Sequence, residues 1–275
     1  MAITSPVVMK VGGDIVADSA LLTALVQQVK AYVSSGGRVV IIHGGGPQAT
    51  ALTRRLGLQV NVVGGRRITA PEVLDVMKMT LAGAVNVDIS AAFRAQSVPA
   101  LGLSGVSAAL VDAVKRPPRV VSGCGDDPVD FGEVGDVSGV NSEAIHRLLS
   151  VGFVPVISSL AATADGRILN INGDIVACHV ATALPATRLV LVTSADGVFR
   201  DLSDPSSRFP RLTVSEARSL IDDGTVHSGM IPKLEEAFRV LDAGVPHVRI
   251  CAITTGGLFD GVESGRSQTG TWLVP

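Results

Sequence analysis

The stretch Arg38-Val39-Val40-Ile41-Ile42-His43-Gly44-Gly45-Gly46-Pro47 decides the fold. Its uninterrupted apolar run predicts a strand buried on both faces, and the glycines and proline behind it predict a turn into a helix. Three successive glycines place no side chain over the backbone, so their N–H groups can face an anion at the start of that helix. We therefore expect a phosphate or carboxylate cradle here. The alternative is that the glycines serve only the turn.

A second junction repeats this pattern near the start of the chain. Val7-Val8-Met9-Lys10-Val11-Gly12-Gly13 reads as a buried strand that ends in a lysine and two glycines. Here too the glycines could serve a turn alone, but a lysine beside them favours phosphate binding. Two strand ends suited to anions in one chain predict an enzyme that uses a nucleotide.

Short runs rich in valine, isoleucine and leucine alternate with amphipathic stretches along the chain, which predicts the α/β class. We expect a three-layer αβα sandwich with a central, mainly parallel open sheet. Strands are expected over residues 7–10, 39–43, 60–63, 98–103, 154–158, 167–170, 189–193 and 248–251. Helices are expected over residues 21–34, 48–56, 71–95, 141–149, 174–183 and 231–241, with short antiparallel ribbons and loops within 104–140. The strand and helix alternation restarts after Pro185, which divides the chain into lobes 1–184 and 185–275.

Composition limits the function further. A chain of 275 residues with 47% hydrophobic residues can bury a substantial core. A net charge of −2, one tryptophan and one tyrosine do not favour nucleic-acid binding. No apolar run approaches the roughly 18 residues of a membrane span, so we expect a cytoplasmic protein without membrane contact. The three cysteines predict reduced thiols, and the five histidines lack metal-binding spacing, so no protein-held metal is expected.

Two of the five lysines fall in apolar motifs. Lys10 ends a buried strand, and Lys233 follows Gly229-Met230-Ile231-Pro232, where the proline predicts the first turn of a helix. An ammonium at a helix N-terminus is unfavourable unless an anion joins it, so a phosphate is the expected partner. Asp174, in Asn170-Ile171-Asn172-Gly173-Asp174, could keep both lysines charged and aimed. The alternatives are a solvated lysine near a turn and an aspartate that only caps a helix.

Gly64-Gly65-Arg66-Arg67-Ile68-Thr69 offers two guanidinium groups that could hold a carboxylate in a two-point contact. Adjacent residues of an extended segment face opposite ways, so one arginine is expected to do so. Walker-type, dinucleotide-binding and GxSxG motifs are absent from the sequence, which disfavours dehydrogenase and hydrolase functions.

Taken in order, these motifs resemble the amino acid kinase family, and within it the branch that phosphorylates N-acetyl-L-glutamate in arginine biosynthesis. The resemblance covers almost the whole chain. It is carried by Lys10 to Gly13, His43 to Pro47, Arg66 to Thr69, Gly102 to Gly105, Gly132 to Gly135 with Val140-Asn141, Asn170 to Asp174, and Gly229 to Lys233.

The resemblance implies an N-terminal lobe that binds the acyl amino acid and a C-terminal lobe that binds ATP. It implies that Lys10 and Lys233 stabilise the phosphoryl group in transit and that Asp174 organises both lysines. The implied phosphate-binding residues are Gly12 and Gly13, and the implied substrate-binding residues are Gly44, Gly45, Arg67 and Asn170. The implied nucleotide contacts are Thr193, Ser194, Asp196, Gly197, Val198, Thr225, Val226 and His227. Mg²⁺ is expected to travel on the phosphates of ATP.

The sequence also departs from the family pattern. Gly64-Gly65-Arg66-Arg67 stands where relatives read Asn-Gly-Leu-Arg, so either arginine could hold the carboxylate; Arg67 is chosen because it directly precedes the Ile-Thr pair. Thr193-Ser194 replaces the usual Thr-Asp. Six residues precede the first strand, without the extra helix of arginine-inhibited relatives, so we expect an arginine-insensitive homodimer. Two other functions stay open: phosphorylation of an aminoadipate substrate, free as the N-acetyl form or on a carrier protein, and a catalytically idle sensor.

Overall fold

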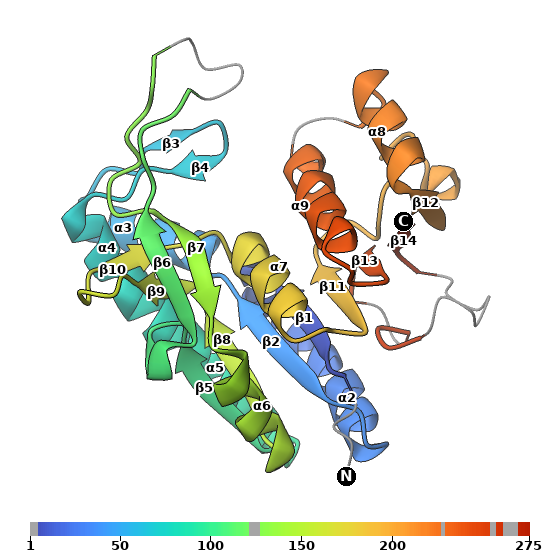
Figure 1. Ribbon diagram of the computed structural model, residues 1–275, viewed down its shortest axis with the longest axis horizontal. Helices are drawn as coiled ribbons and strands as arrows, with labels where there is room; N and C mark the ends of the chain where they lie inside the picture. Colours follow the sequence, from blue (N-terminus) through green and yellow to red (C-terminus); the bar gives the residue numbers. More distant parts are fainter. Residues whose placement is uncertain (1–4, 121–126, 227–228, 254–256, 261–268) are drawn as a thin grey trace.

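The computed structural model describes residues 5–120, 127–226, 229–253, 257–260 and 269–275. Its centre is an eight-stranded sheet in the order β12-β14-β13-β11-β1-β2-β8-β5 (Figure 1). The strands are β1 (Val7–Val11), β2 (Val39–His43), β5 (Ala100–Ser104), β8 (Val154–Ser158), β11 (Arg188–Val192), β12 (Arg211–Thr213), β13 (Val248–Cys251) and β14 (Thr271–Val274). All neighbours pair in parallel except β13 and β14. The predicted α/β class and mainly parallel sheet are confirmed.

Helices cover both faces of this sheet, which makes three layers (Figure 1). One face packs against α1 (Gly13–Ala17), α2 (Ser19–Ser34) and α5 (Asn86–Ala95). The other packs against α6 (Ser142–Ser150), α7 (Gly173–Ala183), α8 (Val214–Asp222) and α9 (Met230–Asp242). The alternation of strand side chains explains this division, since Val8 faces α7 while its neighbours Val7 and Met9 face α2.

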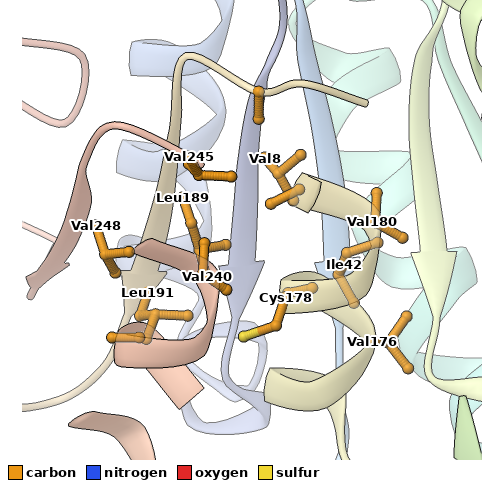
Figure 2. Packing of buried hydrophobic residues seen from close by; sticks show 14 of the residues in the cluster. Val8, Ile42, Val176, Cys178, Val180, Leu189, Leu191, Val240, Val245 and Val248 are labelled. Atoms are coloured by element: carbon orange, nitrogen blue, oxygen red, sulfur yellow. The ribbon is translucent and has the colours of Figure 1, made fainter. Parts of the chain in front are cut away.

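The core between the sheet and helices α7 and α9 fixes where the functional residues lie (Figure 2). Strands β1, β2 and β11 contribute Val8, Ile42, Leu189 and Leu191, and the two helices contribute Val176, Cys178, Val180 and Val240. Because most of these side chains are fully buried, the N-termini of both helices are held over the carboxyl edge of the sheet.

A smaller sheet stands beside the central one. Its strands β6 (Val111–Lys115), β7 (Gly135–Val140), β9 (Leu160–Ala162) and β10 (Ile168–Asn170) are ordered β10-β9-β6-β7. A two-stranded hairpin of β3 (Val62–Val63) and β4 (Arg66–Arg67) lies near its upper end (Figure 1). The antiparallel ribbon expected within residues 104–140 is therefore present as the pair β6 and β7.

The expected long helix over residues 71–95 is continuous but not uniform. It consists of α4 (Pro71–Met77), a π-helical segment η1 (Lys78–Val85) and α5. The wider π turns change which side chains face the sheet, and they place Leu81 against Gly45. The length and composition of this 25-residue stretch would also suit a membrane span, but buried core helices meet the same criteria. Its fully buried Phe93 and Ile89 pack against the central sheet.

Several of the described helices begin with side-chain caps. The Asn141 side chain caps α6 by accepting from the Ala144 N–H at 3.1 Å, and Thr213 with Glu216 forms a capping box on α8. The strand expected over residues 60–63 is shorter in the structure, where it covers only Val62–Val63. Strands β12 and β14 and the helix α1 were not predicted, because three to five residues carry too little periodicity to reveal an element. Cys178 and Cys251 are buried free thiols, and Cys124 lies outside the described residues.

Candidate active site

The two glycine junctions of the sequence lie side by side at the carboxyl edge of the sheet. Strands β1 and β2 are neighbours, so Gly12-Gly13 and Gly44-Gly45-Gly46 emerge together. A Cβ atom on Gly13 would lie 3.0 Å from the Gly45 Cα and 2.6 Å from the Gln48 Oε1, so only glycine permits this approach. The Gln48 Nε2 ties the loops together by donating to the Gly13 carbonyl at 2.6 Å.

The triglycine turn presents its amides at the start of α3 (Gly46–Arg55). The Gly44 N–H donates to the Val11 carbonyl at 3.3 Å, so this amide belongs to the junction between the loops. The first intrahelical bond is donated by Ala49 to the Gly45 carbonyl, which leaves the Gly45 and Gly46 N–H groups ahead of the helical ladder. These two amides are the ones placed to meet an anion.

His43 supports this turn from inside the protein. Its fully buried ring contacts the Gly44 carbonyl through Nδ1 at 2.8 Å and the Asn86 Nδ2 through Nε2 at 2.9 Å. The amide Nδ2 can only donate, so Nε2 accepts and the Nδ1–H donates to Gly44. Burial lowers the pKa of His43 to about 4, although the bond to Gly44 opposes this effect. The imidazole is therefore a neutral strut between Asn86 and the glycine turn.

This neutral histidine predicts a specific loss of stability in acid. Its pKa is about 4 in the folded protein against 6.5 in the unfolded chain, so the unfolded state binds the extra proton between these values. The free energy of unfolding is expected to fall by about 3 kcal/mol as pH drops from 6.5 to 4 on account of this group. Urea unfolding of the protein and of His43→Asn at half-unit pH steps measures it. Equal pH slopes for the two proteins would contradict the assignment.

Lys10, Asp174 and Lys233 form a cluster beside these loops. The Lys10 Nζ lies 3.0 Å from Asp174 Oδ1, and the Lys233 Nζ lies 3.0 Å from Asp174 Oδ2. Lys10 projects from β1 on the α7 face, while Asp174 and Lys233 lie in the first turns of α7 and α9. One carboxylate thus holds two lysines that lie 223 positions apart in the sequence.

The neighbours of Asp174 account for its position and charge. The Asn172 Oδ1 accepts from the Asp174 N–H at 2.8 Å, so Asn172 caps α7 and Asp174 is free to bind the lysines. A Cβ on Gly173 would lie 3.5 Å from the Lys10 Cε and 3.6 Å from the Gly44 N, which places the cluster against the triglycine turn. Burial would raise the pKa of Asp174, but Lys10 and Lys233 outweigh it and lower that pKa.

A cavity of about 930 Å³ opens over this cluster, between the β3–β4 hairpin, β7, α7 and α9. Asp174 and Lys233 line it together with Asn172 and Gly229. Two ammonium groups, oriented amides and a cleft of this size suit stabilisation of a phosphoryl group between two bound substrates.

The arginines of the β3–β4 hairpin face different surroundings, as the sequence predicted. The Arg67 Nη2 donates to Thr50 Oγ1 at 2.5 Å and to the Gly46 carbonyl at 3.3 Å, so Arg67 lies against the glycine turn. Arg66 lines the cavity instead. Asn170 lies on the same side of the site, where its Nδ2 donates to Thr69 Oγ1 at 3.1 Å.

The residues expected to contact the nucleotide lie farther along the sheet edge. Asp196 Oδ1 accepts from the Ala252 N–H at 3.1 Å, and the buried Val198 donates its N–H to Thr271 Oγ1 at 2.8 Å. The Thr225 N–H bonds Asp223, and Val226 is buried. The expected residues Thr193, Ser194 and Gly197 follow β11. None of the seven described residues expected to contact the nucleotide lines the cavity. The eighth, His227, lies outside the described residues.

Metal ligands do not gather in the described part of the chain. It contains no group of three or more histidine, cysteine, aspartate or glutamate side chains that could hold an ion. Both carboxylate oxygens of Asp174 are already paired with lysines. The side chains of this cluster therefore do not fit a protein-held metal.

Sequence comparison gives these residues a context. The pattern of the amino acid kinase family matches residues 5–252. This chain belongs to the amino acid kinase family.

Two relatives in the amino acid kinase family match over nearly their whole length. An acetylglutamate kinase from Anaeromyxobacter dehalogenans strain 2CP-C is 50% identical over 265 residues, which cover 96% of this chain and 98% of the relative. An acetylglutamate kinase from Sorangium cellulosum is 46% identical over 272 residues, which cover 99% and 95%. The solved structure of smu.665 from Streptococcus mutans superposes with a TM-score of 0.78 at 26% identity, covering 98% of each chain.

Proposed function

We propose that this enzyme transfers the γ-phosphoryl group of ATP to the side-chain carboxylate of N-acetyl-L-glutamate. The product is N-acetylglutamyl 5-phosphate, and the reaction is the second step of arginine biosynthesis. The observation that carries the proposal is the convergence of Lys10 and Lys233 on Asp174 beside the glycine amides. The acetylglutamate kinases at 46% and 50% identity support this choice of substrate.

The arrangement suits transfer without a general base. A side-chain carboxylate is already ionised near neutral pH, so its oxygen can attack the γ-phosphorus directly. One P–O bond forms to the carboxylate while the bond to the β,γ-bridging oxygen breaks, and ADP leaves with that electron pair. Lys10 and Lys233 neutralise charge on the phosphoryl group in transit, and Asp174 holds both lysines in position.

The remaining roles complete the proposal. Gly12, Gly13 and the triglycine turn face the phosphoryl group and the reacting carboxylate, while Arg67 and Asn170 hold the acyl amino acid on lobe 1–184. The nucleotide binds on lobe 185–275 near Thr193 to Val198 and Thr225 to His227. Mg²⁺ accompanies ATP on its phosphate oxygens.

An ATP-dependent hydroxamate assay tests the function. Purified enzyme is incubated with Mg²⁺-ATP, hydroxylamine and one acidic acceptor: N-acetyl-L-glutamate, N-acetyl-L-aminoadipate, N-acetyl-L-aspartate or free glutamate. We expect kcat/KM to be highest for N-acetyl-L-glutamate. One methylene group is worth about 10- to 200-fold in discrimination, so aminoadipate should fall behind by that order. Preference for the aminoadipate acceptor, or no hydroxamate with any acceptor, would refute the proposal.

We further propose that the enzyme is a cytoplasmic homodimer that arginine does not inhibit. Light scattering after gel filtration is expected to give twice the 28.2 kDa chain mass. A hexamer whose activity falls in the presence of arginine would contradict this.

A further inference from the structure

The cleft has a cationic wall that the reaction described above does not use. Three arginines from the N-terminal part of the chain line one wall of the cavity: Arg66 of the β3–β4 hairpin, and Arg116 and Arg119, which follow β6. The opposite wall, on α9, carries Lys233 near the catalytic cluster and then Glu235, Glu236 and Arg239. Three guanidinium groups thus line the same cavity as Asp174 and Lys233.

One member of this wall is a fixed support. Arg116 is only 4% exposed; its Nε and Nη2 donate to Asp136 Oδ1 at 2.9 and 2.5 Å, and its Nη2 also reaches the Gly135 carbonyl. Since Asp136 neutralises Arg116, this pair adds little net charge to the cleft. It instead anchors the end of the β6–β7 ribbon rigidly.

Arg66 and Arg119 are different because neither is held by a carboxylate in an ion pair of its own among the described residues. Within the described part of the chain, neither guanidinium has a recorded hydrogen bond or ion pair, and both line the same cavity. Burial lowers the pKa of Arg119, and the charges of Arg116, Arg66 and Arg239 lower it further, while the charge of Asp136 opposes this effect. Asp136 is already engaged by Arg116, so the like charges of Arg66 and Arg119 are only partly compensated and can attract an anion.

The position of this pair selects the ligand. The segment joining β6 and β7 bridges to the substrate side of the site, since Gly132 pairs with Thr69 and Val134 pairs with Asn170. Arg66 is adjacent in sequence to Arg67, the proposed carboxylate-binding residue. The cavity lined by Arg66 and Arg119 also reaches Asp174 and Lys233, so a dicarboxylate bound there would lie near the catalytic cluster.

We propose that Arg66 and Arg119 form an anion-capture subsite for the dicarboxylate acyl amino acid at the mouth of the cleft, separate from Lys10, Lys233 and Arg67. This inference rests on the proposed function. The subsite concentrates the dianion and speeds its encounter with the enzyme, and it does not touch the phosphoryl group. Arg66 and Arg119 therefore determine kcat/KM for the acceptor, not the rate of the transfer step.

The test is the double variant Arg66→Gln/Arg119→Gln, assayed with N-acetyl-L-glutamate and ATP at several salt concentrations. Removing two charges is expected to lower kcat/KM for N-acetyl-L-glutamate about tenfold at low salt, with a smaller difference at high salt. The kcat and the KM for ATP should stay within twofold of wild type. Calorimetric titration of N-acetyl-L-glutamate without nucleotide should show weaker binding in the same proportion.

Two further variants make the result decisive. Arg119→Lys keeps the charge and should remain close to wild type. Arg147→Gln removes one charge from an exposed helical pair with Glu143 outside the cleft and should change neither parameter. An unchanged kcat/KM in an active double variant would refute the subsite and leave the proposed function intact. A fall in kcat, or a loss confined to ATP, would instead assign the arginines to cleft closure or the nucleotide and also refute it.

Discussion

Lys10→Met is expected to lower kcat by about three orders of magnitude while the protein stays folded. The ammonium is held 3.0 Å from Asp174 and lies beside Gly173 and the triglycine turn, where the proposed function puts the migrating phosphoryl group. A preorganised charge of this kind acts mainly on the transition state, and removing one such group costs about 10² to 10³ in kcat. Methionine keeps the length and apolar stem of the side chain, so the packing of β1 should survive. Steady-state kinetics at saturating substrates and thermal melting measure both effects.

The control for this experiment is Lys30→Met, which removes an exposed charge on α2 and should leave kcat unchanged. Lys233→Met should resemble Lys10→Met, because both lysines are proposed to neutralise charge on the same phosphoryl group and share Asp174 as their counterion. The double variant should then lose less than the product of the two single losses. Turnover within tenfold of wild type in either single variant would exclude the proposed mechanism.

The fold was predictable from sequence wherever the period of apolar residues was long or the strand was wholly apolar. Residues 39–43 and 154–158 lie on central strands buried on both faces, so continuous hydrophobicity marks them, and the cap at Asn141 follows from side-chain chemistry alone. The π-helical stretch Lys78–Val85 had no such signal, because its composition is that of any apolar helix. Its Leu81 and Val85 side chains pack against Gly45 of the triglycine turn, a contact that sequence spacing does not encode.

In the candidate site, too, residues in local motifs were predictable and residues brought together only by the fold were not. Glycines followed by a helix and isolated lysines in apolar motifs indicated anion binding, and the structure brings Lys10, Lys233 and Asp174 together. The buried bond between His43 and Asn86 was missed, since residues 43 positions apart carry no local pattern. Of the cationic wall, the sequence pattern indicates Arg66 alone, because Arg116 and Arg119 lie in an irregular segment whose position depends on the β6–β7 ribbon. The signal that could have revealed them is the density of arginines over residues 116–119.

Asp174→Asn separates the structural role of the carboxylate from its effect on catalysis. The substitution keeps the shape of the side chain but leaves two ammonium groups near each other without their shared counterion. Because these side chains are only 13 to 22% exposed, we expect a loss of about 3 kcal/mol in the free energy of unfolding. We also expect kcat to fall at least a hundredfold, since neither lysine is aimed any longer. Urea unfolding and steady-state kinetics measure these losses.

The same variant should respond unusually to anions. Once the carboxylate is replaced by a neutral amide, a sulfate or phosphate ion can occupy the charge gap between Lys10 and Lys233, so either anion should raise the melting temperature of Asp174→Asn more than that of wild type. The matched control is Asp75→Asn, which breaks an exposed pair with Lys78 and should alter neither stability nor anion response appreciably. If Asp174→Asn were as stable as wild type and gained nothing extra from sulfate, the carboxylate would not be the counterion that holds the two lysines together. The electrostatic basis proposed for phosphoryl transfer would then fail with it.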